Sequence, residues 1–448
     1  MADRYDAIVL GMGPGGEVTA GRLIEAGMRV AVVERELIGG ECAYWACIPS
    51  KTLLRPPEAR SEAARAAGLS RPELDWPAVA AYRDYMVRHL DDAAQVGSYE
   101  EQGATVLKAT GRIVGPGVVD ADGHRLETDH VVIATGSEPL VPPIEGLNEV
   151  GFWTNREATT FSEVPSRALV IGGGPVGVEL AQLMSRLGTE VTLVEMAGRL
   201  MAREDPRVGQ LVQTALEAEG ISVRAGRSVQ RVEQSSGAVV ATLDDGSSVS
   251  TDVVVVGVGR SPRVGGVGLE AVGVEAGSRG LPVDDRCRLA DGLWAVGDVT
   301  GVMAFTHVAQ YQGRVVSDNI LGRERTANYR GIPRVVFSDP EVAGVGLTEA
   351  QAREKGMEAA SATVVLPEVL ARPWTYEQDP RGEVGLIADR GRGVLVGAWA
   401  VAPLAGEWVH LAALAIRAEV PVETLVDYVA QFPTYTEAYL KALERLEL

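Results

Sequence analysis

The sequence predicts an α/β protein that contains one strand–turn–helix–strand fold twice and ends in an α+β domain. Three observations indicate this class. A glycine-rich turn between a short apolar strand and a helix occurs near residue 11 and again near residue 172. The 448 residues include 52 glycines and are 46% hydrophobic, which is typical of a globular α/β chain of about three domains. After Tyr329 the strands alternate with no such turn.

The first copy of the fold begins with the apolar run Ala7–Leu10. Gly11, Gly13 and Gly16 follow at G-x-G-x-x-G spacing, and a helical pattern leads to a second apolar run that stops at Glu34. Such glycines permit a tight turn, the approach of a pyrophosphate to the backbone and close helix packing, while the acid accepts ribose hydroxyls. The pattern predicts a Rossmann-like dinucleotide site.

The second copy begins with the strand Arg167–Ile171. Its glycines are Gly172, Gly174 and Gly177, and its acid is Glu195. From first glycine to acid the spacing is 23 residues in both copies (34−11 and 195−172). Two such folds predict two adenine dinucleotides, and the simplest combination is a flavin dinucleotide with a nicotinamide dinucleotide.

The remaining elements are expected from apolar periodicity and turn residues. We expect helices over 52–67 and 76–97, strands over 130–134, 252–259 and 293–298, a Pro-rich linker over 139–146, and, in the last domain, strands over 382–388 and 393–401 followed by two helices.

Cys42 and Cys47 precede the helix expected from Thr52 and are close enough in sequence for a disulfide. A helix N-terminus favours the thiolate form of a cysteine. The pair alone permits two interpretations, a redox-active disulfide between an electron donor and an acceptor, or two buried inert cysteines. Cys287 has no partner in the sequence and is expected to be a packing residue.

Composition limits the partners of the chain. The net charge of −19 argues against nucleic acid and anionic membranes, which require clustered Lys and Arg. No apolar run reaches the ~18 residues of a membrane span, and the opening residues show no signal-peptide pattern. We expect a cytoplasmic protein, in which a disulfide is more often catalytic than structural, and we expect no resident metal.

Taken together, these motifs resemble the class I flavin-dependent pyridine nucleotide–disulfide oxidoreductases, which include dihydrolipoamide dehydrogenase, glutathione reductase and mercuric reductase. The resemblance covers nearly the whole chain. It rests on Gly11–Gly16 with Glu34, Cys42–Lys51, Ala134–Gly136, Gly172–Glu179 with Glu195, Gly257–Pro262, Gly297-Asp298, His307–Ala309 and Pro333–Val342.

The resemblance implies a homodimer with a discontinuous FAD domain, an NAD(P) domain and a dimerisation domain, over residues 1–147 with 279–325, 148–278 and 328–448 respectively. It also implies two sets of cofactor-binding residues. For FAD these are Gly11, Gly13, Gly16, Glu34, Lys51, Thr135, Gly136, Asp298 and Ala309. For NAD they are Gly172, Gly174, Gly177, Glu195 and Gly259.

Catalytic roles follow from the same resemblance. Cys47 would face the flavin and Cys42 the substrate. Lys51, paired with Glu179, would lie where the hydride arrives, since each charge is costly to bury alone. In the second fold Glu195 would accept the 2′-hydroxyl of NAD and repel the 2′-phosphate of NADP, and Met196 takes the place of an arginine that NADP users tend to carry.

Arg199 and Arg203 lie near enough in the sequence to leave NADP(H) open as an alternative cofactor. We expect NADH.

The chain departs from the family at its His-Pro-Thr motif. Glu437 is retained, but Phe432 occupies the place of the histidine that acts as acid–base for the exchange thiol, and a phenyl ring carries no proton. General acid–base help is worth about 10²–10⁴-fold. The paired C-terminal cysteines of mercuric reductase are also missing, which disfavours that activity.

The loop between the two cysteines differs from its relatives as well. Tyr44 and Ala46 replace the usual Asn and Gly, with Trp45 between them. The two aromatic residues permit two interpretations: they pack in the protein interior, or they offer a face on which a flat acceptor can stack.

We therefore expect an NAD(P)H-dependent FAD oxidoreductase that passes electrons to a small acceptor, either quinone-like or an unusual disulfide. One alternative is a dihydrolipoamide dehydrogenase with a substitute proton route. A further alternative is a non-catalytic, FAD-bound binding subunit.

Overall fold

The computed structural model describes residues 3–235 and 237–448, and its tertiary contacts divide them into two units. The first unit contains residues up to Ser50, Ala81–Leu140 and Gly259–Asn328. The second contains Lys51–Ala80, Val141–Val258 and Tyr329–Leu448. The three-domain division expected from the sequence stays a prediction, because the units reflect contact alone.

The first unit is organised around an eight-stranded sheet of order β16-β17-β6-β1-β2-β3, with β4 and β5 joined through β6. Its strands are β1 (Asp3–Leu10), β2 (Val30–Val33), β3 (Thr105–Leu107), β4 (Gly111–Gly115), β5 (Val118–Ala121), β6 (His124–Ile133), β16 (Arg288–Ala290) and β17 (Leu293–Ala295). Strands β17, β6, β1, β2 and β3 run parallel. The apolar runs of β1, β2, β6 and β17 are buried, as a sheet covered on both faces requires.

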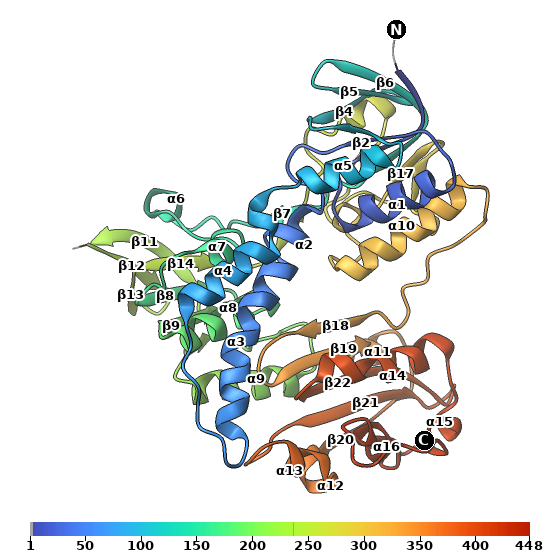
Figure 1. Cartoon of the computed structure of the whole chain (residues 1–448). Coiled ribbons are helices and arrows are strands. Elements are labelled where there is room, and N and C mark those ends of the chain that lie inside the picture. The colour runs from blue at the N-terminus through green and yellow to red at the C-terminus, as the bar shows by residue number, and fades with distance from the viewer. Residues whose placement is uncertain (1–2, 236) are drawn as a thin grey trace. The chain divides into compact units, whose positions relative to one another are not determined.

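Helices cover this sheet, and α1 and α10 lie side by side (Figure 1). The other elements of the unit include a two-stranded sheet of β7 and β15. The bounds are α1 (Pro14–Glu25), α2 (Gly40–Tyr44), η1 (Arg88–Leu90), α5 (Ala93–Glu101), β7 (Ser137–Pro139), β15 (Arg260–Pro262), η2 (Leu269–Val272), η3 (Asp298–Thr300) and α10 (Thr306–Ile320). Helices α3 (Cys47–Arg65) and α4 (Trp76–Met86) have residues in both units.

The second unit holds three sheets. A parallel sheet has the order β10-β9-β8-β14, an antiparallel one β11-β12-β13, and a five-stranded antiparallel one β18-β19-β22-β21-β20. The strands are β8 (Arg167–Ile171), β9 (Glu190–Glu195), β10 (Ser222–Ala225), β11 (Val229–Ser235), β12 (Ala238–Leu243), β13 (Ser248–Thr251), β14 (Val253–Val256), β18 (Pro333–Val336), β19 (Glu341–Gly346), β20 (Ala359–Val365), β21 (Glu383–Asp389) and β22 (Val394–Ala402).

Helices of the second unit flank the parallel sheet and the five-stranded sheet, with α14 packed on β19 and β22. The bounds are α6 (Leu147–Val150), α7 (Glu157–Thr160), α8 (Pro175–Leu187), α9 (Pro206–Ala218), α11 (Glu349–Glu354), α12 (Leu366–Val369), α13 (Arg372–Tyr376), α14 (Ala405–Ala418), α15 (Val422–Val426) and α16 (Glu437–Leu443). The strands and helices expected after Tyr329 are thus found in an α+β arrangement.

The two glycine turns have matching geometry. Gly11 and Gly172 have φ of +98° and +111°, which favour glycine. A Cβ on Gly16 would lie 2.1 Å from the Gly11 carbonyl oxygen, and one on Gly177 would lie 1.8 Å from the Gly172 carbonyl oxygen. Each helix therefore packs against its own turn only because these positions lack a side chain.

Helix α3 begins five residues earlier than expected. Pro49 lies in its first turn, where the missing N–H leaves no helical hydrogen bond unmade, so it does not stop the helix. Cys47 is consequently the first residue of the helix, and Lys51 follows one turn later.

The second expected helix, 76–97, is wrong as a single element. The chain forms α4, η1 and α5 instead, because residues 88–90 have positive φ. Tertiary contacts compete with helix formation here. Asp92 accepts the Ile38 N–H at 2.7 Å and binds the Lys108 ammonium at 2.6 Å.

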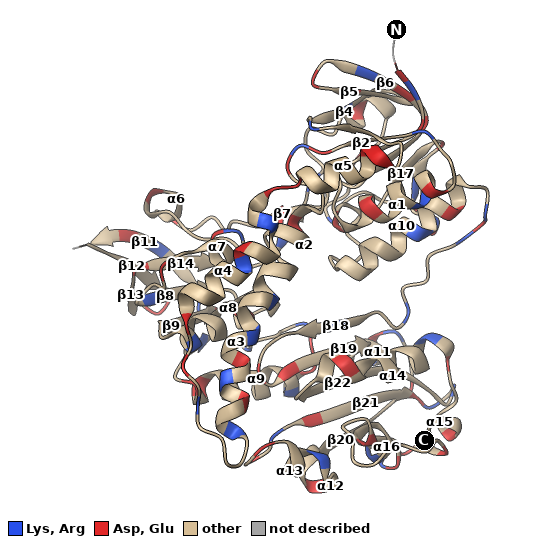
Figure 2. Ribbon diagram, in the orientation of Figure 1, with Lys and Arg blue, Asp and Glu red and all other residues tan. Residues whose placement is uncertain are grey.

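Charged side chains form a network inside the second unit, and Figure 2 shows both signs along α3. The Arg65 guanidinium binds both oxygens of Asp339, at 2.8 and 2.9 Å, and also Glu377 at 2.5 Å. Arg186 binds the same Asp339 at 2.7 Å and Glu219 at 2.6 Å. The network fixes α3 and α8 to the loop before β19.

Glu341 lies beside this network at the start of β19. Its Oε2 accepts the Gly406 N–H at 2.7 Å. Burial, together with the nearby carboxylates of Glu58, Glu407 and Asp339, raises the pKa of Glu341 to about 7.

The folded-state pKa of Glu341 lies above the unfolded value, so this carboxyl contributes to the stability of the fold. The contribution is complete below about pH 4.5 and is lost as the pH rises through 7. Raising the pH from 5 to 8 should lower the free energy of unfolding of both proteins. We predict that the decrease is about 1–3 kcal/mol smaller for Glu341→Gln, which keeps the acceptor oxygen, than for the parent. Urea unfolding at both pH values measures the difference. Glu423→Gln, at an exposed carboxylate, is the control; parallel profiles for Glu341→Gln and the parent would contradict the assignment.

The glycine geometry yields a second prediction. Gly16→Ala should destabilise the protein by about 1–3 kcal/mol, because the new methyl group meets backbone. Gly21→Ala, in the same helix with no atom within 4 Å of the new Cβ, should stabilise it by about 0.5–1 kcal/mol. Thermal unfolding of both variants checks the contrast, and equal melting temperatures would refute it.

Candidate functional site

The two thiols of the first unit lie beside its glycine turn. Gly39 and Gly40 make this possible, since a Cβ on Gly40 would lie 2.8 Å from Gly13 Cα. Gly39 N–H also donates to the Met12 carbonyl at 2.7 Å. Helix α2, which carries Cys42, is thereby held against the start of α1.

Cys42 and Cys47 are both thiols in this structure, and their side chains are hydrogen bonded to each other. The Thr306 hydroxyl lies 3.2 Å from Cys42 Sγ and 3.4 Å from Cys47 Sγ. The pKa of Cys42 is raised, first by its hydrogen bond with Cys47, then by burial. The pair is thus juxtaposed as dithiol chemistry requires, and disulfide formation stays a prediction. Cys287, by contrast, is fully buried.

The aromatic residues between the cysteines have different surroundings. Tyr44 is fully buried, and its hydroxyl donates to the Ile38 carbonyl at 3.1 Å. Arg88 lies over its ring, 5.7 Å from the centroid. Tyr44 is therefore a packing residue. Trp45 is half-buried and tilted against Tyr44, with ring centroids 5.7 Å apart.

Lys51 and Glu179 form an ion pair in the second unit. Lys51 Nζ lies 2.8 Å from Glu179 Oε2 and 4.8 Å from the centroid of the Phe337 ring. Glu179 is 7% exposed, and its Oε1 accepts the Phe337 N–H at 2.9 Å. Both carboxylate oxygens are therefore bonded, which compensates for the burial of the charge.

The two strand-end acids are held in the same way. Glu34 accepts the N–H groups of Met12 and Glu36, each at 2.7 Å. Glu195 accepts those of Gly173 and Ala197, each at 2.6 Å. In both folds the acid therefore bonds the residue after the first glycine and the residue two places after itself.

The turns fit dinucleotides. The N-cap residues of helices α1 and α8 are Gly13 and Gly174, which offer no side-chain cap to the N–H groups of the first turn. A Cβ on either glycine would meet no atom within 4 Å, so space remains at each helix N-terminus. Open space, free donors and a fixed carboxylate suit a pyrophosphate and a ribose.

The other residues expected at the flavin lie together in the first unit. Thr135 Oγ1 donates to the Arg263 carbonyl at 2.7 Å, and Gly136 has φ of +71° with open space at its Cβ position. Asp298 accepts the Ser137 hydroxyl at 2.6 Å. Ala309 is buried on α10. Gly259, expected at NAD, has φ of +139° and falls by contact in the first unit.

The segment that departs from the family lies just before α16. Phe432 is 65% exposed. Glu437 Oε2 accepts the Thr434 N–H at 2.9 Å. The neighbouring Tyr435 is buried and stacked on Trp408, and burial raises its pKa. Its phenol therefore does not replace an imidazole.

Sequence reasoning missed two polar groups of the first unit. Thr306 reaches both thiols from more than 250 residues away in the chain, so no local signal indicated it. Buried Gln312 accepts the Gly297 N–H at 2.7 Å and donates to Thr300 at 3.2 Å, which fixes the turn before Asp298. In the sequence, only the position of Gln312 on the same helix, six residues after Thr306, could have indicated this role.

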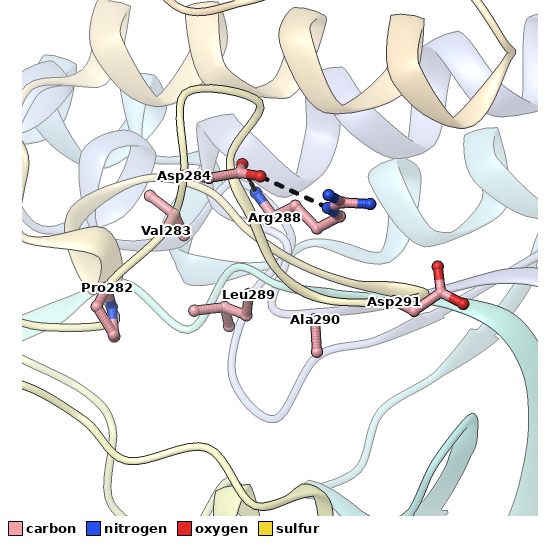
Figure 3. A pocket seen from close by; sticks show the side chains of 7 residues that line it. All are labelled: Pro282, Val283, Asp284, Arg288, Leu289, Ala290 and Asp291. Carbon is pink, nitrogen blue, oxygen red and sulfur yellow. Dashed lines mark hydrogen bonds and ion pairs between the residues drawn. The ribbon is translucent and has the colours of Figure 1, made fainter.

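A pocket of about 580 Å³ lies on the first unit (Figure 3). It is lined by Pro282, Val283, Asp284, Arg288, Leu289, Ala290 and Asp291. Arg288 and Asp284, which both line it, form an ion pair at 3.5 Å. None of the predicted site residues lines it, so it is not part of the candidate site.

The described residues contain neither a membrane-spanning helix nor a cluster of metal ligands. No helix among them has both the length and the apolarity needed to cross a membrane. Nor do His, Cys, Asp and Glu side chains gather there in groups of three or more that could hold a metal ion.

Comparison with known proteins identifies the family. Residues 5–313 match the model of the pyridine nucleotide-disulphide oxidoreductases, and residues 332–443 match the dimerisation domain of the same family. The chain is 36% identical to a mercuric reductase of Streptomyces lividans, over 97% of this chain and 94% of that protein. It is 34% identical to a dihydrolipoyl dehydrogenase of Thermus scotoductus, over 99% and 97%.

Solved structures agree. The flavoprotein disulfide reductase RclA of Escherichia coli superposes with a TM-score of 0.88 at 25% identity, covering 99% of this chain and 100% of that one. LpdA of Mycobacterium tuberculosis superposes with a TM-score of 0.87 at 26% identity, covering 99% of both. The matched dimerisation domain supports a homodimer. The chain therefore belongs to the pyridine nucleotide–disulphide oxidoreductases, flavoproteins that use FAD and NAD(P)H.

Proposed function

We propose that this protein oxidises NADH through FAD and passes the electrons to a small acceptor, a quinone-like compound or an unusual disulfide. One observation carries the proposal. The chain has both thiols and a Lys51–Glu179 ion pair, whereas Phe432 stands where the family has its histidine. The residues that the family uses to accept electrons from the nicotinamide are thus present, but the histidine that acts as base in thiol exchange is not. A cytoplasmic location stays a prediction.

The family resemblance assigns the cofactor roles, and the contacts of the first unit support them. Glu34 would hold the adenosine ribose, Asp298 the ribityl chain, and the Gly11–Gly16 turn the pyrophosphate. Thr135, Gly136 and Ala309 would line the flavin ring. The bound FAD supplies hydride acceptance and electron transfer, which no side chain of the protein provides.

Lys51 and Glu179 would orient the reacting end of the cofactor. Glu179 is fixed by the Phe337 N–H and holds the Lys51 ammonium, so the positive charge has one defined position. A cation held there favours negative charge that develops on a reduced ring. Cys47 would be the thiol nearer the flavin and Cys42 the one nearer the acceptor.

The nature of the acceptor follows from proton chemistry. A dithiol substrate must lose a proton to attack a disulfide, because the thiolate is the nucleophile. Glu437 would orient a base, but Phe432 offers none. A quinone can take electrons from reduced flavin without thiol exchange, so the substitution leaves that reaction intact.

Contacts of the second glycine turn favour NADH. Glu195 is fixed by two backbone N–H groups, and its negative charge would repel a 2′-phosphate. Arg199 donates to the carbonyls of Met201, Ala202 and Glu204, so its guanidinium is engaged with its own loop. Met196 is 79% exposed and uncharged.

The acceptor assignment is tested with purified holoprotein, NADH and parallel acceptors. We predict rapid turnover with menadione and slow turnover with lipoamide. Phe432→His should raise the lipoamide rate at least about 10-fold and leave the menadione rate within about twofold. Val429→His, at a 94% exposed position of the same segment, is the matched control and should change neither rate.

Rapid lipoamide turnover by the parent would instead support a dihydrolipoamide dehydrogenase. Absence of flavin reduction by NADH and by NADPH would support the binding subunit. Since the matched relatives include mercuric reductases, a further arm offers Hg(II); NADH oxidation that depends on Hg(II) would contradict the proposed acceptor.

Nicotinamide choice is tested separately. Met196→Arg places a cation beside Glu195 and should raise kcat/KM for NADPH about 10-fold, with that for NADH nearly unchanged. Steady-state kinetics with both nucleotides measures the ratio. A parent enzyme that already prefers NADPH would refute the charge argument.

A further inference from the structure

The Thr306 hydroxyl contacts both thiols of the pair. Its Oγ1 lies 3.2 Å from Cys42 Sγ, to which it donates, and 3.4 Å from Cys47 Sγ, where either atom can be the donor. Cys42 Sγ also accepts the backbone N–H of Cys47. Because a hydroxyl rotates freely about its C–O bond, its single proton can be directed to either sulfur.

Thr306 is held in this position by the fold. It is the first residue of α10, which lies beside α1, the helix that begins at the glycine turn. The preceding Phe305 is the N-cap and makes no side-chain cap. The Thr306 hydroxyl is therefore not needed to cap the helix.

The charges around the pair are largely matched. Glu41, adjacent to Cys42 on α2, is neutralised by Arg260 and Arg263, at 3.7 and 3.5 Å. His307 follows Thr306 on α10 and is exposed. On α3 the next cation after Cys47 is Lys51, which is bound to Glu179. Two side chains that act on Cys42 Sγ are those of Cys47 and Thr306.

We propose that Thr306 is a catalytic residue that stabilises the singly ionised dithiol by donating its hydroxyl proton to whichever sulfur carries the charge. The inference rests on the proposed redox role of the Cys42–Cys47 pair. It names the group that supports the thiolate in a chain with no histidine at position 432. A hydrogen bond to a charged group is stronger than one to a neutral group, so the hydroxyl favours the thiolate over the thiol.

No proton enters or leaves the cysteine pair when the charge moves from one sulfur to the other. When Cys47 is the thiolate and Cys42 the thiol, the S–H proton moves along the hydrogen bond between the two sulfurs, and the negative charge moves the opposite way. Thr306 keeps its own proton and rotates from Cys47 to Cys42. No bond to carbon or sulfur other than S–H changes, and no external base is required.

The test measures thiol ionisation rather than turnover. Holoprotein is reduced, freed of reductant and reacted with iodoacetamide from pH 5 to pH 10, and peptide mass spectrometry follows each cysteine. Fully buried Cys287 serves as the unreactive reference. Thr306→Val keeps the shape and removes the hydroxyl, whereas Thr306→Ser keeps the hydroxyl.

Thr306→Val should raise the lower ionisation midpoint of the pair by about one pH unit, which slows alkylation at pH 7 about 10-fold. Thr306→Ser should match the parent within about twofold. An unchanged midpoint in Thr306→Val, or equal shifts in both variants, would overturn the inference. Neither result depends on NADH oxidation, so failure of the proposed function is recognised separately by the acceptor assays.

Discussion

The contact between each helix and its own glycine turn is the constraint on which both nucleotide folds depend. At Gly16 and Gly177 the helix backbone lies so close to the preceding carbonyl that no Cβ fits. This approach directs the uncapped helix N-terminus at the end of the strand, where the strand-end acid is also fixed. The anion site expected in each fold would thus be built from backbone, and side chains beyond the acid would be left free to differ.

Much of this architecture could be predicted from the sequence. The repeated glycine spacing, the apolar strands and the two acids are local patterns, and the structure places Glu34 and Glu195 at equivalent hydrogen-bonded positions. The family assignment and its cofactors are confirmed by the matched family models. The roles of the individual site residues stay predictions.

The errors have a common physical origin. The helix over 76–97 is interrupted because Asp92 bonds residues remote in sequence, which helical periodicity does not reveal. The early start of α3 depends on Pro49 being in a first turn, and the contact of Thr306 with the thiols joins segments more than 250 residues apart. Long-range contacts of this kind require the folded chain.

The matched hydrogen bonding of Glu34 and Glu195 has a consequence for ligand choice. Each acid is held by two backbone N–H groups in the same pattern, so the adenosine ends of the two expected sites would offer nearly the same recognition. The acids therefore cannot decide which site receives the flavin and which the nicotinamide. That distinction depends on the other half of each ligand, the flavin or the nicotinamide. A fragment limited to the shared adenosine moiety should therefore bind both folds with little discrimination.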